Sequence, residues 1–134
     1  MPVISLQSQV VAAIVDHARE AAPAECCGLL LGHGDAIVEA VRTRNIADRP
    51  TRFQIDPEGH IRARREARAR GLEVLGFYHS HPHSEARPSA TDRAEAEYPD
   101  CLYVIVSLAS EPPTFGLFRL RDGNFGEGLS VRVD

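Results

Sequence analysis

Residues 76–92 of the 134-residue chain read GFYHSHPHSEARPSATD, and two histidines stand two positions apart in this stretch. The apolar run before them predicts a core strand over residues 74–80, and Pro82 ends it because proline has no backbone N–H to give to a sheet. Side chains two positions apart on a strand leave the same face. We therefore expect His79 and His81 to project side by side where the strand ends.

The two residues that precede the histidines at the same spacing, Leu75 and Phe77, are large and apolar. They predict that this face of the strand points into the core, with the imidazoles at its polar end. A single histidine in such a place usually packs as a core residue, but two can converge on one metal ion. The pair alone leaves both interpretations open. His83, in the loop beyond, is either an ordinary exposed residue or a substrate contact.

A carboxylate that follows the histidines favours the metal site. Pro88 stiffens the return of the loop over residues 82–90, and Ser89 or Thr91 can cap a short helix after it. This turn can bring Asp92, in the first turn of the helix, back toward the imidazoles. Two histidines and one carboxylate suit Zn²⁺ at bond lengths of about 2.0–2.2 Å. Three protein ligands leave one position open, as in catalytic rather than structural zinc sites.

The spacing of these residues also resembles that of a known enzyme family. His79-x-His81, seven further residues, Ser89, two residues and then Asp92 match the JAMM motif of the JAB1/MPN/Mov34 metalloproteases. Upstream, residues 23–32 (PAECCGLLLG) look like that family's other element, in which a glutamate opens an apolar strand before Gly-Leu. A later Tyr-Pro-Asp turn and the apolar strand after it extend the similarity over nearly the whole chain.

The resemblance implies a fold and a set of site residues. The implied fold is an α/β JAB/MPN domain with a mixed, mostly antiparallel, curved sheet flanked by helices, similar to cytidine deaminases. His79, His81 and Asp92 match the family's ligands for one Zn²⁺ per chain. Glu25 matches its general base, and Ser89 matches the hydroxyl that stabilises the oxyanion. The role of Glu25 rests on the resemblance alone, because by itself this residue would be interpreted as a surface carboxylate at a strand end.

Similarity to this family implies hydrolysis of a peptide or isopeptide bond after the C-terminal tail of a ubiquitin-like protein. The segment between Asp56 and Val74 is too short for the insertions with which larger eukaryotic members grip two ubiquitins. The chain looks more like the compact bacterial members that act on sulfur-carrier proteins with a Gly-Gly tail, some of which release cysteine or another amine. Such a tail could reach the metal by strand addition. The identity of the carrier and the oligomeric state, a homodimer included, stay open.

Three other functions remain as alternatives. They are a non-catalytic MPN-type binding module, a DNA-repair-associated JAMM-like protein, and a closed structural zinc site with a cysteine as fourth ligand. The candidates for that cysteine are Cys26, Cys27 and Cys101. Other zinc motifs are absent from the sequence, which has neither the H-E-x-x-H of helical metalloproteases nor the C-x-x-C of nucleotide deaminases.

The composition is that of one globular domain over residues 1–134, with 43% hydrophobic and 25% charged residues. A net charge of −4 argues against general nucleic-acid binding. No apolar run approaches the roughly 18 residues of a membrane span, and the first residues lack the features of a signal peptide. Three cysteines without a disulfide pattern suit a reducing compartment, so we expect a cytoplasmic protein.

Periodicity and turn residues predict the remaining elements. Ser5 is expected to cap a first helix whose apolar stripe includes Val10, Ile14 and Ala18. A helix over residues 57–70 carries many arginines, which form either a solvated outer face or a docking surface for an acidic partner. Strands are predicted over residues 26–32, 36–44, 51–55, 102–108 and 115–121, with a final strand toward Val133.

Overall fold

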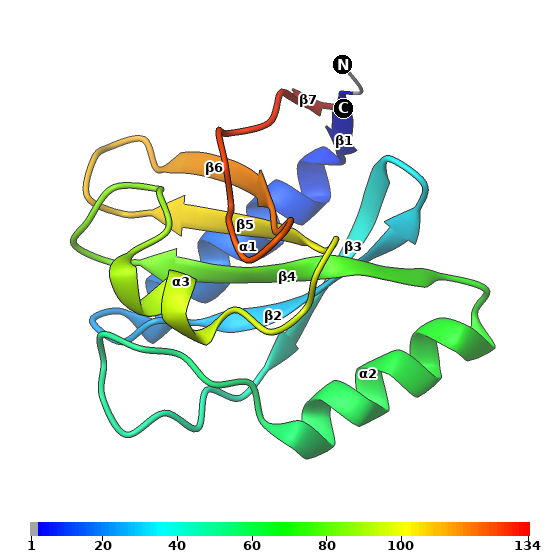
Figure 1. Cartoon of the computed structure of the whole chain (residues 1–134), viewed down its shortest axis with the longest axis horizontal. Coiled ribbons are helices and arrows are strands. Elements are labelled where there is room, and N and C mark those ends of the chain that lie inside the picture. Colours follow the sequence, from blue (N-terminus) through cyan, green and yellow to red (C-terminus); the bar gives the residue numbers. More distant parts are fainter. Residues whose placement is uncertain (1–2) are drawn as a thin grey trace.

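The computed structural model of the protein describes residues 3–134, which form one seven-stranded sheet with helices on both faces (Figure 1). The strands lie in the order β6-β5-β4-β2-β3-β1-β7. Within residues 3–134, no helix is long and apolar enough to cross a membrane. The elements in chain order are β1 (Ile4–Leu6), α1 (Ser8–Ala21), β2 (Cys27–His33), β3 (Ala36–Thr43), α2 (Pro57–Ala69), β4 (Glu73–His81), α3 (Ala90–Glu95), β5 (Leu102–Ser107), β6 (Thr114–Arg119) and β7 (Val131–Val133).

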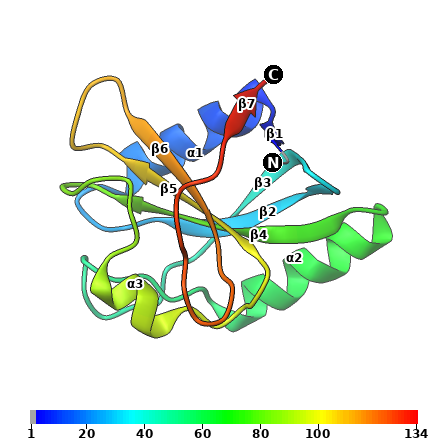
Figure 2. The ribbon, with the colours of Figure 1, turned by 45° about the horizontal axis from the view of Figure 1, so that its top comes forward.

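The sheet mixes the two pairing modes, as the sequence predicts. Strand β2 pairs antiparallel with β3 and β4, and β5 pairs antiparallel with β6. Strand β4 runs parallel to β5, and the short β1 runs parallel to β3 and β7. Antiparallel pairs account for most of the paired residues. Successive strands are rotated relative to one another (Figure 2), which is the normal twist of a sheet and curves it around the helices.

Two apolar cores lie on the two faces of the sheet. Helix α1 covers one face through Ile14 and its neighbours, which pack with Leu30 and Tyr78. Helix α2 covers the other through two small residues, Ala63 and Ala67, which pack in the same core as Phe77. The arginines of α2 lie on its outer side and are all exposed. This second face of the sheet, between α2 and α3, is the one on which the histidines of β4 lie.

Two of the predicted elements differ from the structure. Ser5 lies in β1 and its hydroxyl donates to Asp134, so it does not cap α1, whose N-cap is Gln7. Residues 51–55 form no strand, and Ile55 makes only an isolated bridge to Asn45. The predicted final strand toward Val133 is present as β7, which pairs with β1.

The expectation for Leu75 is also wrong, because β4 contains a bulge. Leu30 pairs with Gly76 while Leu31 pairs with Val74, which leaves Leu75 as an extra residue. Leu75 therefore packs in the α1 core, whereas Phe77 lies in the α2 core. Beyond the bulge, β4 passes close to β5: a Cβ on Gly76 would lie 1.9 Å from the backbone oxygen of Leu102. The regular alternation that sets the direction of the histidines begins only after this point.

Candidate metal centre

The two histidines end β4, an interior strand of the sheet that lies between β2 and β5. His79 pairs with Cys27 on one side and Ile105 on the other, so its backbone is held by both neighbours. Both imidazoles are almost completely buried, and their Nε2 atoms lie 3.2 Å apart. The predicted arrangement of His79 and His81 on one face is therefore confirmed.

The cap of helix α3 brings Asp92 to the histidines. Ser89 is the N-cap, and its Oγ accepts a hydrogen bond of 3.0 Å from the backbone N–H of Asp92. In return, the backbone N–H of Ser89 donates to Asp92 Oδ2 over 2.9 Å, which completes a capping box. The same Oδ2 lies 3.1 Å from His79 Nε2 and 3.0 Å from His81 Nε2. One short turn thus fixes both the cap and the carboxylate.

These three atoms have the spacing of metal ligands. In a tetrahedral zinc site with bonds of about 2.0–2.1 Å, two ligand atoms lie about 3.3 Å apart. Here, the three separations are 3.2, 3.1 and 3.0 Å. The donor set of two imidazole nitrogens and one carboxylate oxygen is also one that zinc prefers.

The hydrogen bond of His81 to Glu85 determines which of its ring nitrogens faces the other ligand atoms. Its Nδ1 lies 2.7 Å from the backbone carbonyl oxygen of Glu85, and a carbonyl only accepts, so Nδ1 carries the proton and donates. Nε2 is then the ring nitrogen that faces the Asp92 oxygen. The raised pKa of His81 favours a proton on Nε2 when no metal is bound, and a metal ion would take the place of that proton. A hydrogen bond from the other ring nitrogen to a backbone carbonyl, such as that of Glu85, commonly orients metal-binding histidines.

Glu25 joins this cluster from the loop just before β2. A ligand atom from each of Glu25, His79, His81 and Asp92 lies within 4.8 Å of all the others. Glu25 is only 7% exposed, and its Oε1 atom is buried without a hydrogen-bond partner among the described residues. Burial raises the pKa of this carboxyl group to about 7, although His81 opposes the shift. The structure therefore brings the predicted base to the predicted ligands.

The pKa shifts of the other three groups show how strongly the cluster is coupled. Burial by itself raises the pKa of Asp92, but the hydrogen bonds from both histidines outweigh it and hold that pKa well below its usual range. Burial lowers the pKa of His79. Burial also acts to lower the pKa of His81, but the bonds to Asp92 and to the Glu85 carbonyl raise it overall. Asp92 is therefore a carboxylate and His79 a neutral imidazole, the forms that bind metals.

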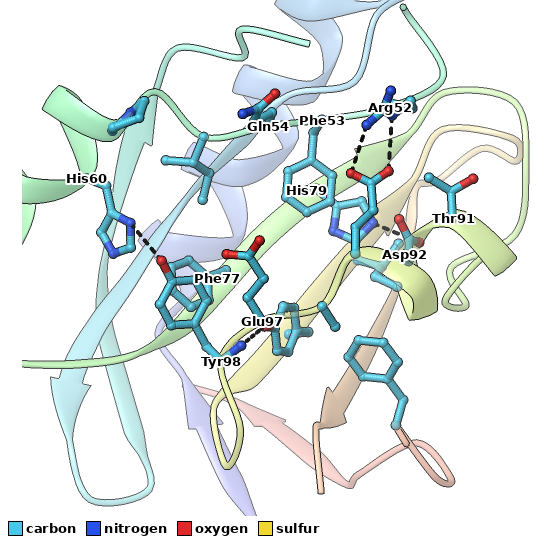
Figure 3. Close-up of a pocket in the computed structure, with 17 residues that line it drawn as sticks. Arg52, Phe53, Gln54, His60, Phe77, His79, Thr91, Asp92, Glu97 and Tyr98 are labelled. Carbon is cyan, nitrogen blue, oxygen red and sulfur yellow. Dashed lines mark hydrogen bonds and ion pairs between the residues drawn. The ribbon is translucent and has the colours of Figure 1, made fainter. Parts of the chain in front are cut away.

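A cavity of about 370 Å³ opens beside the cluster and reaches His79 and Asp92 (Figure 3). Aromatic side chains, Phe77 and Tyr98 among them, form much of its wall. Phe53 stacks on the imidazole of His79, with ring centroids 4.3 Å apart. Because the cavity touches two of the donor residues, a molecule in it can reach an ion held there.

Some residues near the site were not predicted from the sequence. Arg52 makes a bidentate ion pair with Glu95 of α3, with both bonds 3.0 Å long, and lies at the rim of the cavity. Together with Phe53 it comes from the segment predicted to be a strand. No pattern in the sequence points to these contacts, since charged and aromatic residues are common in loops.

The structure gives no support to a closed structural zinc site. In the described part of the chain, the metal-ligand cluster contains no cysteine. Cys26 packs in the α1 core, and the thiol of Cys27 lies 3.4 Å from the hydroxyl of Thr43. Burial raises the pKa of both thiols to about 11, which disfavours the thiolate that zinc needs. His83 is exposed and lies outside the cluster.

The fold, the buried donor set and the open cavity together define a metal-dependent hydrolase of the JAMM class. Residues 7–121 match the family described as prokaryotic homologs of the JAB domain, and the chain belongs to that family. The chain is 40% identical over 111 residues to a desampylase of Haloferax volcanii, covering 78% of this chain and 80% of that protein.

Two further similarities agree with this family. The chain is 34% identical over 107 residues to the CysO-cysteine peptidase of Mycobacterium tuberculosis, covering 78% of this chain and 73% of that one. The solution structure of protein DSY2949 from Desulfitobacterium hafniense superposes with a TM-score of 0.89 at 32% identity. That alignment covers 98% of this chain and 92% of the other, so the fold is shared almost end to end.

Proposed function

We propose that this protein is a zinc peptidase that hydrolyses the bond after the C-terminal Gly-Gly tail of a ubiquitin-like sulfur-carrier protein, releasing cysteine or another amine. The proposal rests on the convergence of Glu25, His79, His81 and Asp92 within 4.8 Å beside an open cavity. The similarity to a desampylase and to a CysO-cysteine peptidase supports this class of substrate. Three free cysteines suit the cytoplasm as the place of the reaction.

In this proposal, His79, His81 and Asp92 hold one zinc ion. Zinc supplies a Lewis acid and a bound water whose pKa is lowered from about 15.7 to near 7. Glu25 takes the proton from the attacking water and later gives it to the leaving amine. Burial raises the pKa of the Glu25 carboxyl group above its ordinary value, which suits a group that must both accept a proton and return it.

The Ser89 hydroxyl is suited to stabilise the developing oxyanion. Its oxygen accepts from the backbone N–H of Asp92, which leaves the hydroxyl proton free to be donated. Ser89 is exposed, so a substrate can approach it. The capping box holds this hydroxyl at a constant position next to the carboxylate ligand.

Replacing Ser89 by alanine is expected to lower kcat by about 10²–10³-fold, the usual effect of losing one oxyanion donor. The substitution also removes the α3 cap, which typically stabilises a protein by about 1 kcal/mol. Zinc content and thermal unfolding must therefore be measured with the rate. Full zinc content with a low kcat would support the donor role, whereas unchanged turnover would show that the oxyanion donor is another group. Ser110→Ala, on an exposed loop, is the control.

The 370 Å³ cavity is the place that we assign to the carrier tail. Its aromatic wall, which includes Phe77, Tyr98 and Tyr103, suits an apolar side chain of the tail, and it leads to His79 and Asp92. A tail that ends in two glycines has no side chains at the scissile bond, so its carbonyl can come close to buried groups.

Two carrier substrates test the proposed function: a Gly-Gly-tailed sulfur carrier extended by a C-terminal cysteine, and the same carrier joined to a lysine side chain. Mass spectrometry is expected to show cleavage after the second glycine. Chelation should abolish cleavage while the far-UV circular dichroism stays nearly unchanged, and Zn²⁺ should restore it. A carrier ending in Ala-Ala is the matched control. No trimming of either substrate by the zinc-loaded protein would disprove the assignment.

A further inference from the structure

The side chain of Asn45 makes all four hydrogen bonds that an amide group can form. Its Nδ2 donates to the backbone oxygens of Glu25 and Arg52, over 2.9 and 3.0 Å. Its Oδ1 accepts from the backbone N–H groups of Ala47 and Gln54, both over 2.9 Å. Asn45 therefore closes the loop over residues 45–55 on itself and ties it to Glu25, two residues before β2. An amide with both donors and both acceptors in use fixes its neighbours in one arrangement.

This loop also contacts the elements that carry the other groups of the metal centre. The backbone N–H of Glu25 donates to the carbonyl oxygen of Pro50 over 3.1 Å, so the loop binds both backbone polar groups of Glu25. Phe53 stacks on His79 (Figure 3). Arg52 pairs with Glu95 of α3, the helix whose first turn contains Asp92. One loop thus touches the base, one histidine and the helix of the carboxylate.

We propose that Asn45 is a positioning residue for the reaction, which sets the Glu25 carboxylate relative to the metal ligands through the loop over residues 45–55. Asn45 itself does not belong to the donor cluster. The ligands His79 and His81 are held by β4, whereas Glu25 lies outside the strands. Its neighbour Cys26 is bonded to Ser80 of β4, but the backbone N–H and carbonyl groups of Glu25 itself are bound by the loop. This inference rests on the proposed function, in which Glu25 is the base.

The test is Asn45→Asp, which keeps the size of the side chain and its acceptor atoms but removes both donors. A carboxylate would face the carbonyl oxygens of Glu25 and Arg52, and repulsion would displace Glu25. A displacement of a reacting group by about 1 Å costs roughly 10²-fold in rate. We therefore expect kcat to fall by about 10–100-fold, KM to change by less than about 3-fold and the zinc content to stay at the wild-type value. Gln9→Glu makes the same amide-to-acid change on the exposed side of α1 and serves as the control.

A crystal structure of Asn45→Asp gives a readout independent of turnover. It should show Glu25 displaced while His79, His81 and Asp92 keep their places. An undisplaced Glu25, an unchanged kcat, or a loss of rate that matches a loss of zinc would each overturn the proposal. If wild-type protein cleaves no carrier, the proposed function fails. The crystal structure still shows whether Asn45 positions Glu25. Should Asn45→Asp not fold, Asn45→Ser, which can donate only one hydrogen bond, is measured in the same way.

Discussion

Replacing Glu25 by glutamine is expected to leave the zinc bound and to lower kcat by about 10²–10⁴-fold, the usual contribution of a general base. Glutamine has nearly the same size but cannot take a proton from water. The three proposed metal ligands keep their contacts, because none of the hydrogen bonds among His79, His81 and Asp92 involves the Glu25 side chain. In this variant, the rate is therefore expected to fall while the zinc content stays at the wild-type value.

Metal analysis and single-turnover kinetics on the same preparation check this result. Glu66→Gln, an equal change on an exposed position of α2, is the matched control and should behave as wild type. A kcat close to that of wild type would show that another group takes the proton. Stability is also informative: glutamine removes a buried carboxyl group whose Oε1 atom has no partner among the described residues, so Glu25→Gln should unfold at an equal or higher temperature.

The parts of the fold that could be predicted are those whose pattern is local. The strand over residues 73–81 and the helix over residues 57–69 have an apolar run or a capped amphipathic pattern, and both lie within a few residues of the prediction. Ser5 was misassigned because a serine before an apolar stripe suits a helix cap equally well. Only pairing with β3 and β7, far along the chain, makes it a strand residue. The bulge at Leu75 likewise depends on the partner strand.

The candidate site likewise contains residues that a local sequence pattern predicts and residues that only the folded chain brings together. His79, His81 and Asp92 lie within one strand, loop and helix, so their spacing predicts that they meet. Glu25 is far from them in sequence, and the antiparallel pairing of β2 with β4 is what brings it close. Its place could be predicted only from resemblance. Asn45 leaves no signal at all in the sequence, since its function depends on four backbone groups that come together only in the folded chain.

Replacing His79 by alanine is expected to remove the metal and, with it, all measurable peptidase activity. Changes in the groups around metal ligands already cost about 10–100-fold in affinity, and loss of a ligand costs more. The other two donors cannot compensate, because His81 is oriented by Glu85 and Asp92 by the α3 cap. Neither can move toward the space left by the imidazole without breaking its own hydrogen bond.

Zinc content after gel filtration, together with competition by a chromophoric chelator, measures this effect. His83→Ala, an exposed histidine two positions beyond His81, is the control and should bind zinc as wild type does. The loss of a buried ring that stacks on Phe53 also leaves a cavity, so far-UV circular dichroism must show that His79→Ala is folded. A folded His79→Ala protein with full zinc content would contradict the metal centre itself. The catalytic roles assigned to Glu25, Ser89 and Asn45 would then also be contradicted, because each depends on an ion held between the two histidines and Asp92.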